Sequence, residues 1–298
     1  MQALWMLLGA LFFSTMAVCV KVASAWFSST ELVFYRGAFG MLFMWLLARR
    51  QGITLATHHP GMHAWRSLAG VISLGAWFYG IAHLPLATAV TLNYMSSVWV
   101  AAFLVGGMLL ARRPKSGSVI APAPLRQGPL VLTVLAGFAG VIVMLRPTVE
   151  QNQVFAALVG LMSGLTAAFA YMQVKALGKI GEHESRTVFY FAVASALAGG
   201  LGMAVGGLSP WDWRHALWLV PVGLLASLGQ LCITRAYSHG ATLVVANLQY
   251  SGIVFGAIYG VLLFGERITL SGWAGMALIV ASGIAATVLR SGRAEPAR

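Results

Sequence analysis

Short polar segments divide this chain into long apolar stretches, and this pattern restricts the fold more than any motif does. A helix that crosses a bilayer needs about 20 apolar residues. Only 9% of the residues are charged, whereas a soluble domain carries roughly 25%. The sequence therefore predicts an all-α membrane protein with ten transmembrane helices, at 3–23, 32–48, 66–82, 87–110, 129–146, 154–174, 187–206, 215–235, 242–264 and 270–289.

Lysines and arginines are distributed unevenly between the two sets of loops. With a cytoplasmic N-terminus, 14 of the 19 basic residues fall in the cytoplasmic loops and tail. Because such an excess is typical of the cytoplasmic side, we expect both the N- and the C-terminus to face the cytoplasm. The same bias accounts for the net charge of +12. No sustained basic stripe is present, so nucleic acid is not an expected partner.

The two halves of the sequence resemble each other at a separation of 154 residues. Ser73-Leu74-Gly75 recurs as Ser227-Leu228-Gly229, Lys21 as Lys175, and Asn93 as Asn247; Phe34-Tyr35 recurs as Phe189-Tyr190 with a one-residue slip. Each half then holds five spans, and because five is odd the second half enters the membrane from the opposite side. Inverted repeats of this kind are typical of secondary transporters. We divide the chain into a first five-helix repeat (1–146, with a cytoplasmic loop at 111–127), a second (147–291) and a cytoplasmic tail (292–298).

The end of the second half carries a family pattern. Asn247-Leu248-Gln249-Tyr250 is followed by Gly256, Gly260, Phe264-Gly265-Glu266-Arg267, Gly272-Trp273, Gly275 and Ser282-Gly283. This resembles the end of an EamA-type module of the drug/metabolite transporter superfamily, and the first half, from Leu4 to about Leu145, resembles the partner module. The first module has Ala111-Arg112-Arg113 where the second has Gly265-Glu266-Arg267. The sequence therefore argues against a role that requires this glutamate in both halves.

The resemblance implies a carrier in a bacterial inner membrane that moves small metabolites by alternating access and needs no cofactor. Within this superfamily, the sequence most resembles bacterial exporters of aromatic amino acids. This resemblance implies export of aromatic or neutral amino acids. Proton-coupled export, import of another metabolite or drug, and a channel remain alternatives. An enzyme is not expected, because the seven histidines lie in loops or at helix ends, and no phosphate-binding loop occurs. The same histidine positions leave no buried metal site apparent.

The carboxylates bear on energy coupling, because acidic groups inside a membrane commonly carry protons or ions. All seven fall in loops or at helix ends: Glu31, Glu150, Glu182, Glu184, Asp212, Glu266 and Glu295. This distribution favours facilitative transport. Coupling through a group nearer to a membrane surface is the alternative.

Four charged residues near span ends are candidates for gating: Lys21, Glu31, Arg36 and Lys175. Either lysine can reach the membrane surface by snorkelling, which would explain it without a function. The functional alternative is a cation that meets a substrate carboxylate at one mouth of a cavity. Lys21 is the better candidate, because Glu31 and Arg36 lie nearby in sequence and would complete a gate.

Matching polar faces on the fourth and ninth spans predict a substrate site between the halves. Asn93 and Ser97 share one helix side, as do Asn247 and Ser251. Hydrogen bonding between helices is the competing explanation for such polar residues, and plain packing is the competing explanation for aromatic ones. We predict substrate contacts from Trp77, Tyr79, Asn93, Tyr94, Ser97, Trp99, Tyr171, Gln230, Asn247 and Tyr250.

Glycines recur at four-residue spacing, as in Gly252, Gly256 and Gly260. Small residues at this spacing let helices approach closely. The expected partners are the lipid bilayer and a small-molecule substrate. The expected state is a monomer, and a homodimer through such glycine faces is the alternative.

Overall fold

The computed structural model describes residues 2–110, 128–145, 153–240 and 242–291. Within these ranges the regular structure is entirely helical. The helices are α1 (Gln2–Ala23), α2 (Ser29–Arg50), α3 (Pro60–His83), α4 (Leu86–Tyr94), α5 (Ser96–Leu110), α6 (Gly128–Leu145), α7 (Val154–Lys179), α8 (Glu184–Gly206), α9 (Trp213–Ala216), α10 (Leu219–His239), α11 (Thr242–Gln249), α12 (Ser251–Phe264) and α13 (Leu270–Ser291). The expected loop 111–127, the repeat boundary at 146 and the tail 292–298 lie outside the described residues.

Several helical segments have the length and composition of membrane spans. Among the described residues, six segments are long and apolar enough to cross a bilayer: Ala3–Ala23, Ser29–Arg50, Leu86–Phe103, Val154–Lys179, Glu184–Gly206 and Trp213–His239. Shorter apolar helices occur at Ser251–Phe264 and Leu270–Ser282. The prediction of an all-α chain with several membrane-length apolar helices is confirmed.

Two helices begin earlier than the apolar pattern predicts. α2 starts at Ser29 because Ser28 and Glu31 form a capping box, in which each side chain accepts from the other's backbone N–H. α3 starts at Pro60 instead of residue 66, because a proline at the first helical position is already fixed in a helical φ. The prediction was short at these ends because hydropathy detects only the apolar part of a helix. One result is that Arg66 lies inside α3 instead of at its end.

Two of the predicted spans are interrupted in the middle. The span 87–110 divides into α4 and α5 at Met95, and the span 242–264 divides into α11 and α12 at Tyr250. By the separation of 154 residues, Met95 is equivalent to Gln249, the last residue of α11. The two interruptions therefore fall at almost the same point of each half.

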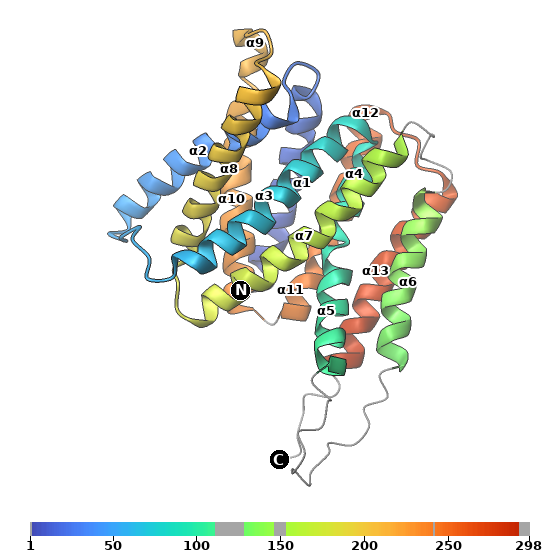
Figure 1. The fold of residues 1–298 in the computed structure, drawn as a ribbon. Coiled ribbons are helices and arrows are strands. Elements are labelled where there is room, and N and C mark those ends of the chain that lie inside the picture. The colour runs from blue at the N-terminus through green and yellow to red at the C-terminus, as the bar shows by residue number, and fades with distance from the viewer. Residues whose placement is uncertain (1, 111–127, 146–152, 241, 292–298) are drawn as a thin grey trace.

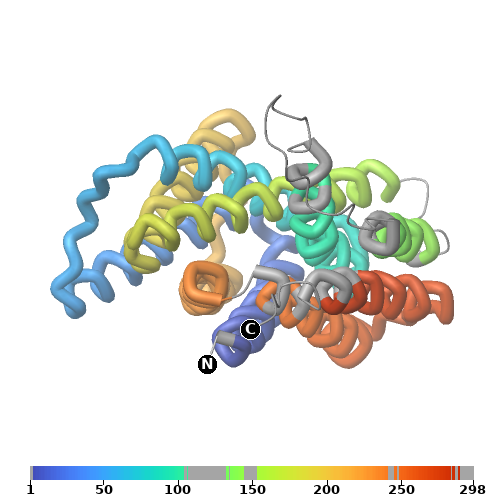
Figure 2. Tube along the Cα trace, turned by 90° about the horizontal axis from the view of Figure 1, so that it is seen from below, coloured from blue at the N-terminus to red at the C-terminus, as the bar shows by residue number. Residues whose placement is uncertain are grey.

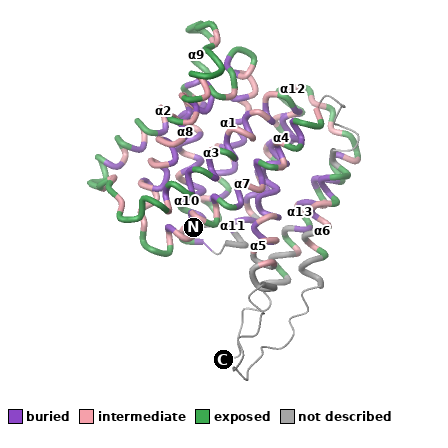
Figure 3. Tube along the Cα trace, viewed as in Figure 1, coloured by how far each residue is buried: buried purple, intermediate pink, exposed green. Residues whose placement is uncertain are grey.

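Four helix pairs pack most extensively, namely α2 with α8, α3 with α7, α1 with α10, and α6 with α13. Figures 1 and 2 show α6 and α13 together at one end of the molecule and the loop joining α2 and α3 at the other. All nine residues of α4 are buried, and Figure 3 shows buried residues concentrated in this interior. The core therefore lies around α4, which packs on α12, α7, α3 and α1.

Candidate functional site

A narrow cavity lies inside the bundle, where helices from both halves of the sequence meet. Seven helices contribute to its wall, through Phe13, Arg36, Arg66, Gly70, Ser73, Leu74, Trp77, Asn93, Tyr94, Ala167, Ala170, Tyr171, Phe191 and Gln230. The space open to the centres of water-sized molecules is about 40 Å³, which is room for roughly three waters. In this conformation the space is too small for a metabolite, which therefore needs helix movement to enter.

Two arginines dominate the wall of this cavity. The exposed fraction is 5% for Arg36 and 2% for Arg66. Their guanidinium carbons lie 5.0 Å and 3.8 Å from the centre of the Phe191 ring, so both cations rest against the same aromatic side chain. Nε of Arg36 and both Nε and Nη1 of Arg66 are buried without a hydrogen-bond partner. Buried polar atoms are ordinarily paired, so these orphaned donors call for a functional explanation.

The position of Arg66 depends on a glycine one turn further along α3. A side chain at Gly70 would collide with Nη1 of Arg66 and with the ring of Phe191. The absence of a side chain at position 70 thus leaves the space in which the guanidinium lies. Since Arg66 and Gly70 are four residues apart, they lie on the same face of α3.

The described carboxylates all have partners other than these two arginines. Glu182, Glu184 and Asp212 pair with histidines, and Glu182 also with Arg186. Glu31 accepts from Ser28 and Ser209. Glu266 accepts from the backbone N–H groups of Leu86 and Ala87 at the start of α4. Within the described part of the chain, no acidic side chain neutralises Arg36 or Arg66.

Beside the cavity, Gln249 links three helices through hydrogen bonds. Its Nε2 donates to the Tyr171 hydroxyl at 3.1 Å, and its Oε1 accepts from Tyr237 at 2.9 Å and from Ser97 at 3.4 Å. The rings of Tyr171 and Tyr237 stack with their centres 4.8 Å apart. Gln249 is completely buried, so this network fixes the orientation of Tyr171 in the cavity wall.

A second network joins the interrupted helix α4 to α3 and α7. The Asn93 amide donates to the Ser163 hydroxyl at 3.1 Å, and Ser73 donates to the Ser163 carbonyl at 2.8 Å. Since Asn93 and Ser73 also line the cavity, movement of α4 relative to α7 would change the wall directly.

Half of the ten predicted substrate contacts lie in the cavity wall: Trp77, Asn93, Tyr94, Tyr171 and Gln230. The other described ones lie elsewhere. Tyr79 stacks on His83 with ring centres 4.1 Å apart, and Trp99 packs edge-on to Phe138 at 4.7 Å.

Three predicted contacts lie on the two interrupted spans. Ser97 donates to the Ala246 carbonyl at 2.9 Å. Tyr250 is buried at the interruption itself. Asn247 lies on α11, but its side chain is outside the part that the structure describes.

The candidate gating residues do not form one cluster. Lys21 donates to the Leu84 carbonyl just after α3, and Lys175 donates to the Gly240 carbonyl just after α10. Glu31 caps α2 and binds Ser209, whereas Arg36 lines the cavity. Each lysine thus donates to a carbonyl just after the end of a helix, and Arg36 has Arg66 as its neighbour in place of Lys21.

Sequence reasoning missed Arg66, Gly70, Phe191 and Gln249 as site residues. The predicted span 66–82 begins at Arg66, which places this residue at a helix end. Pro60 was the available signal, since a helix that begins at Pro60 carries Arg66 nearly two turns inward. Gln249 belongs to the family pattern, but no polar residue lies three or four positions from it. The sequence therefore shows no polar helix face that includes Gln249.

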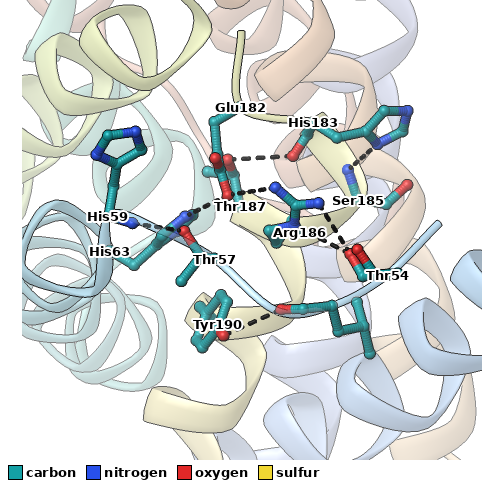
Figure 4. Close-up of polar contacts among 11 residues, drawn as sticks. Thr54, Thr57, His59, His63, Glu182, His183, Ser185, Arg186, Thr187 and Tyr190 are labelled. Atoms are coloured by element: carbon teal, nitrogen blue, oxygen red, sulfur yellow. Dashed lines mark hydrogen bonds and ion pairs between the residues drawn. The ribbon is translucent and has the colours of Figure 1, made fainter. Parts of the chain in front are cut away.

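A separate polar cluster joins the loop after α2 to the loop after α7 (Figure 4). Glu182 accepts from His63 at 3.1 Å and from Arg186 at 2.9 Å, and Arg186 also donates to the Thr54 carbonyl. Burial raises the pKa of Glu182, but hydrogen bonds from Arg186, His63 and Thr57 and the charge of Arg186 lower it more, so the net pKa lies below its ordinary value. We call these residues, Glu182, His63, Arg186 and Thr54, the Glu182 cluster.

Replacing Glu182 with glutamine should lower stability at neutral pH by about 2–3 kcal/mol, because charge-assisted hydrogen bonds are lost. A carboxylate with a lowered pKa stabilises above its unfolded pKa, and this contribution disappears as pH falls through the folded pKa. In thermal unfolding in detergent, the Tm of the wild type should therefore exceed that of Glu182→Gln at pH 7. This difference in Tm should vanish at pH values below the ordinary pKa range of glutamate. Glu184→Gln, at the first residue of α8, is the control and should change little, because its histidine partners are largely exposed. A difference that persists unchanged in acid would contradict this role.

A bundle of apolar helices that encloses a polar cavity is the architecture of a membrane carrier for a small solute. The chain belongs to the EamA-like transporter family, whose model matches residues 1–121 and 154–288, and thus to the drug/metabolite transporter superfamily. This is a family of transporters and not of enzymes.

Named relatives cover nearly the whole chain. It is 33% identical over 280 residues to the pseudopaline exporter of Pseudomonas aeruginosa PAO1, covering 94% of this chain and 93% of the relative. It is 27% identical over 285 residues to a riboflavin transporter of Rhizobium johnstonii, covering 95% and 89%. A crystal structure with 16% identity matches with a TM-score of 0.69 over 99% of each chain, which shows the shared fold.

Proposed function

We propose that this protein is a ten-span secondary transporter that exports small carboxylate-bearing metabolites across a bacterial inner membrane by alternating access. Amino acids with aromatic or neutral side chains are the first substrates to test. The two halves are inverted five-helix repeats, both termini are cytoplasmic, and the protein works as a monomer without a cofactor.

The pairing of helices supports the inverted repeat. The separation of 154 residues relates α1 to α7 and α3 to α10. The packing of α1 on α10 therefore corresponds to the packing of α7 on α3, and the same separation relates α2 to α8, which also pack together. α6 and α13, which form another pair, are the last helices of their halves. Arg36 and Phe191 directly follow the repeated Phe-Tyr pairs and contact each other. The cavity thus lies where the two halves meet, as expected for a transporter of this type.

The observation that carries the proposal is a narrow cavity between helices of both halves, whose wall holds two guanidinium groups without a carboxylate partner among the described residues. Arginine binds carboxylates through two parallel hydrogen bonds. In the proposed mechanism Arg36 and Arg66 hold a substrate carboxylate, and Trp77, Tyr94 and Tyr171 contact the rest of the molecule. Since the described acidic side chains are engaged elsewhere, transport is facilitative. Rocking of one repeat against the other would expose the cavity to each side in turn.

Counterflow in liposomes tests the proposal. Purified full-length protein is reconstituted with an unlabelled carboxylate-bearing compound inside, amino acids and other carboxylates in turn, and the uptake of the same labelled compound is followed with and without a pH gradient. Saturable exchange that ignores the gradient is expected. Uphill movement driven by the gradient would replace the facilitative mechanism with proton coupling, and flux that does not saturate would indicate a channel.

Replacing Asn93 with alanine should reduce this exchange roughly tenfold or more while changing stability by about 1 kcal/mol, since one buried hydrogen bond to Ser163 is lost. Exchange rate and thermal unfolding are measured on the same preparation. Thr166→Val is the control, because Thr166 bonds only carbonyls of its own helix. Normal exchange by the Asn93 variant would remove this residue from the site.

A further inference from the structure

The charge balance of the cavity distinguishes between classes of substrate. The wall carries two cations, Arg36 and Arg66, and the described acidic side chains are paired elsewhere. A neutral amino acid would bring one carboxylate together with an ammonium group, so the occupied cavity would keep its excess positive charge. Two carboxylates on one molecule would neutralise it.

We propose that the cavity selects small metabolites with two carboxylate groups, and that neutral zwitterionic amino acids bind poorly by comparison. This inference rests on the proposed carrier function and narrows the substrate of the same site. Each guanidinium group binds one carboxylate. The two positive charges of the empty cavity are thereby neutralised in the complex.

The arrangement of hydrogen-bond donors fits such a ligand. Three guanidinium nitrogens are buried without partners, two of them on Arg66. Both guanidinium groups contact the Phe191 ring, so they present neighbouring donor sets to one space. Tyr171 accepts a hydrogen bond from Gln249, which leaves its own hydroxyl proton to donate to a third oxygen.

A purely structural explanation of the two arginines fits the contacts less well. A buried cation that only supports the fold is expected to have a carboxylate or a backbone carbonyl as a partner, because desolvation of an unpaired charge is costly. Lys21 and Lys175 follow that pattern, since each donates to a backbone carbonyl. In contrast, Arg36 and Arg66 both lie against the aromatic ring of Phe191. The absence of a side chain at Gly70 leaves the space that Arg66 occupies.

Ligand protection of the purified full-length protein tests the proposal. Thermal unfolding in detergent is measured with succinate, glutarate, citrate, inorganic phosphate, phenylalanine or sodium chloride, all at matched ionic strength. At least one of the carboxylates should raise the Tm of the wild type by about 3–5 °C over chloride, whereas phenylalanine should not. Protection by phosphate alone would overturn the assignment to carboxylates, and protection by phenylalanine alone would overturn the charge argument.

Three methionine variants separate binding from structural support. Arg66→Met and Arg36→Met should each abolish protection by the carboxylate, and their ligand-free Tm should equal or exceed that of the wild type because an uncompensated charge has been removed. Arg49→Met is the matched control, since Arg49 also lies over an aromatic ring, 4.3 Å from Trp45, but at the exposed end of α2. A lower ligand-free Tm in both cavity variants would identify the arginines as structural and overturn the proposal.

Counterflow separates failure of this inference from failure of the proposed function. Exchange of the protecting carboxylate, reduced at least about 100-fold in Arg66→Met and unchanged in Arg49→Met, is expected. Arg66→Lys should recover only part of the rate, because lysine keeps the charge but not the two-pronged geometry. Exchange of phenylalanine without exchange of any di- or tricarboxylate would overturn the inference and leave the carrier function standing. No saturable exchange of any compound would contradict both.

Discussion

Replacing Gly199 with valine is expected to prevent formation of a stable folded protein. A side chain at position 199 on α8 would overlap the backbone nitrogen and Cα of Phe34 on α2. On the other side of the same contact, a side chain at Gly37 would overlap the backbone of Ala196. Overpacking a core costs about 1–3 kcal/mol when side chains can adjust. Here backbone meets backbone, so we expect a loss above about 4 kcal/mol.

Size-exclusion chromatography and thermal unfolding in detergent measure this effect. Gly206→Val is the control, because Gly206 ends the same helix and faces open space. A monodisperse Gly199→Val protein with the wild-type Tm would show that α2 and α8 do not pack through these glycines. Since α2 and α8 are equivalent helices of the proposed repeats, it would also remove one support for the inverted arrangement.

Replacing Gln249 with leucine should reduce transport by about 10–100-fold while leaving a folded protein. Leucine has a similar length but can neither donate to Tyr171 nor accept from Tyr237 and Ser97. Each buried group that loses its partner costs about 1–3 kcal/mol. Tyr171 would then be free to leave the orientation in which it lines the cavity, so exchange should suffer more than stability.

A double-mutant cycle with Tyr237→Phe tests this interpretation, because residues in one hydrogen-bond network have non-additive effects. Exchange rate and Tm are measured for both single variants and for the double variant. The double variant should resemble Gln249→Leu alone in both quantities. Strictly additive losses would show that Gln249 and Tyr237 act independently, which would contradict the network.

The sequence predicted the helical membrane class because ten apolar runs and a low charge content leave few alternatives. It predicted helix ends less well where capping or proline extends a helix into polar residues. Ser28 with Glu31 begins α2, and Pro60 begins α3. The second extension matters most for the site, because it moves Arg66 from the predicted helix end to a position inside α3, where it lines the cavity.

Within the site, residue type and span depth did not determine which side chains meet. Tyr79 and Tyr94 both looked suitable, yet only Tyr94 lines the cavity, because Tyr79 stacks on His83 of its own helix and packs edge-on to Phe155. The orientation of each helix follows from long-range contacts, such as the close approach of Gly164 on α7 to the Leu92 carbonyl. Such contacts join residues far apart in the chain, so a single sequence does not reveal them.

A cavity with two cations and no acidic partner among the described residues also has an electrical consequence. The bacterial inner membrane is negative inside, and moving one charge across 100 mV changes the free energy by about 2.3 kcal/mol. A substrate with two negative charges would therefore gain about 4.6 kcal/mol per 100 mV on leaving the cell. The membrane voltage would expel such a substrate against a concentration ratio of roughly a thousandfold, and the transporter would need no proton-carrying carboxylate to do so.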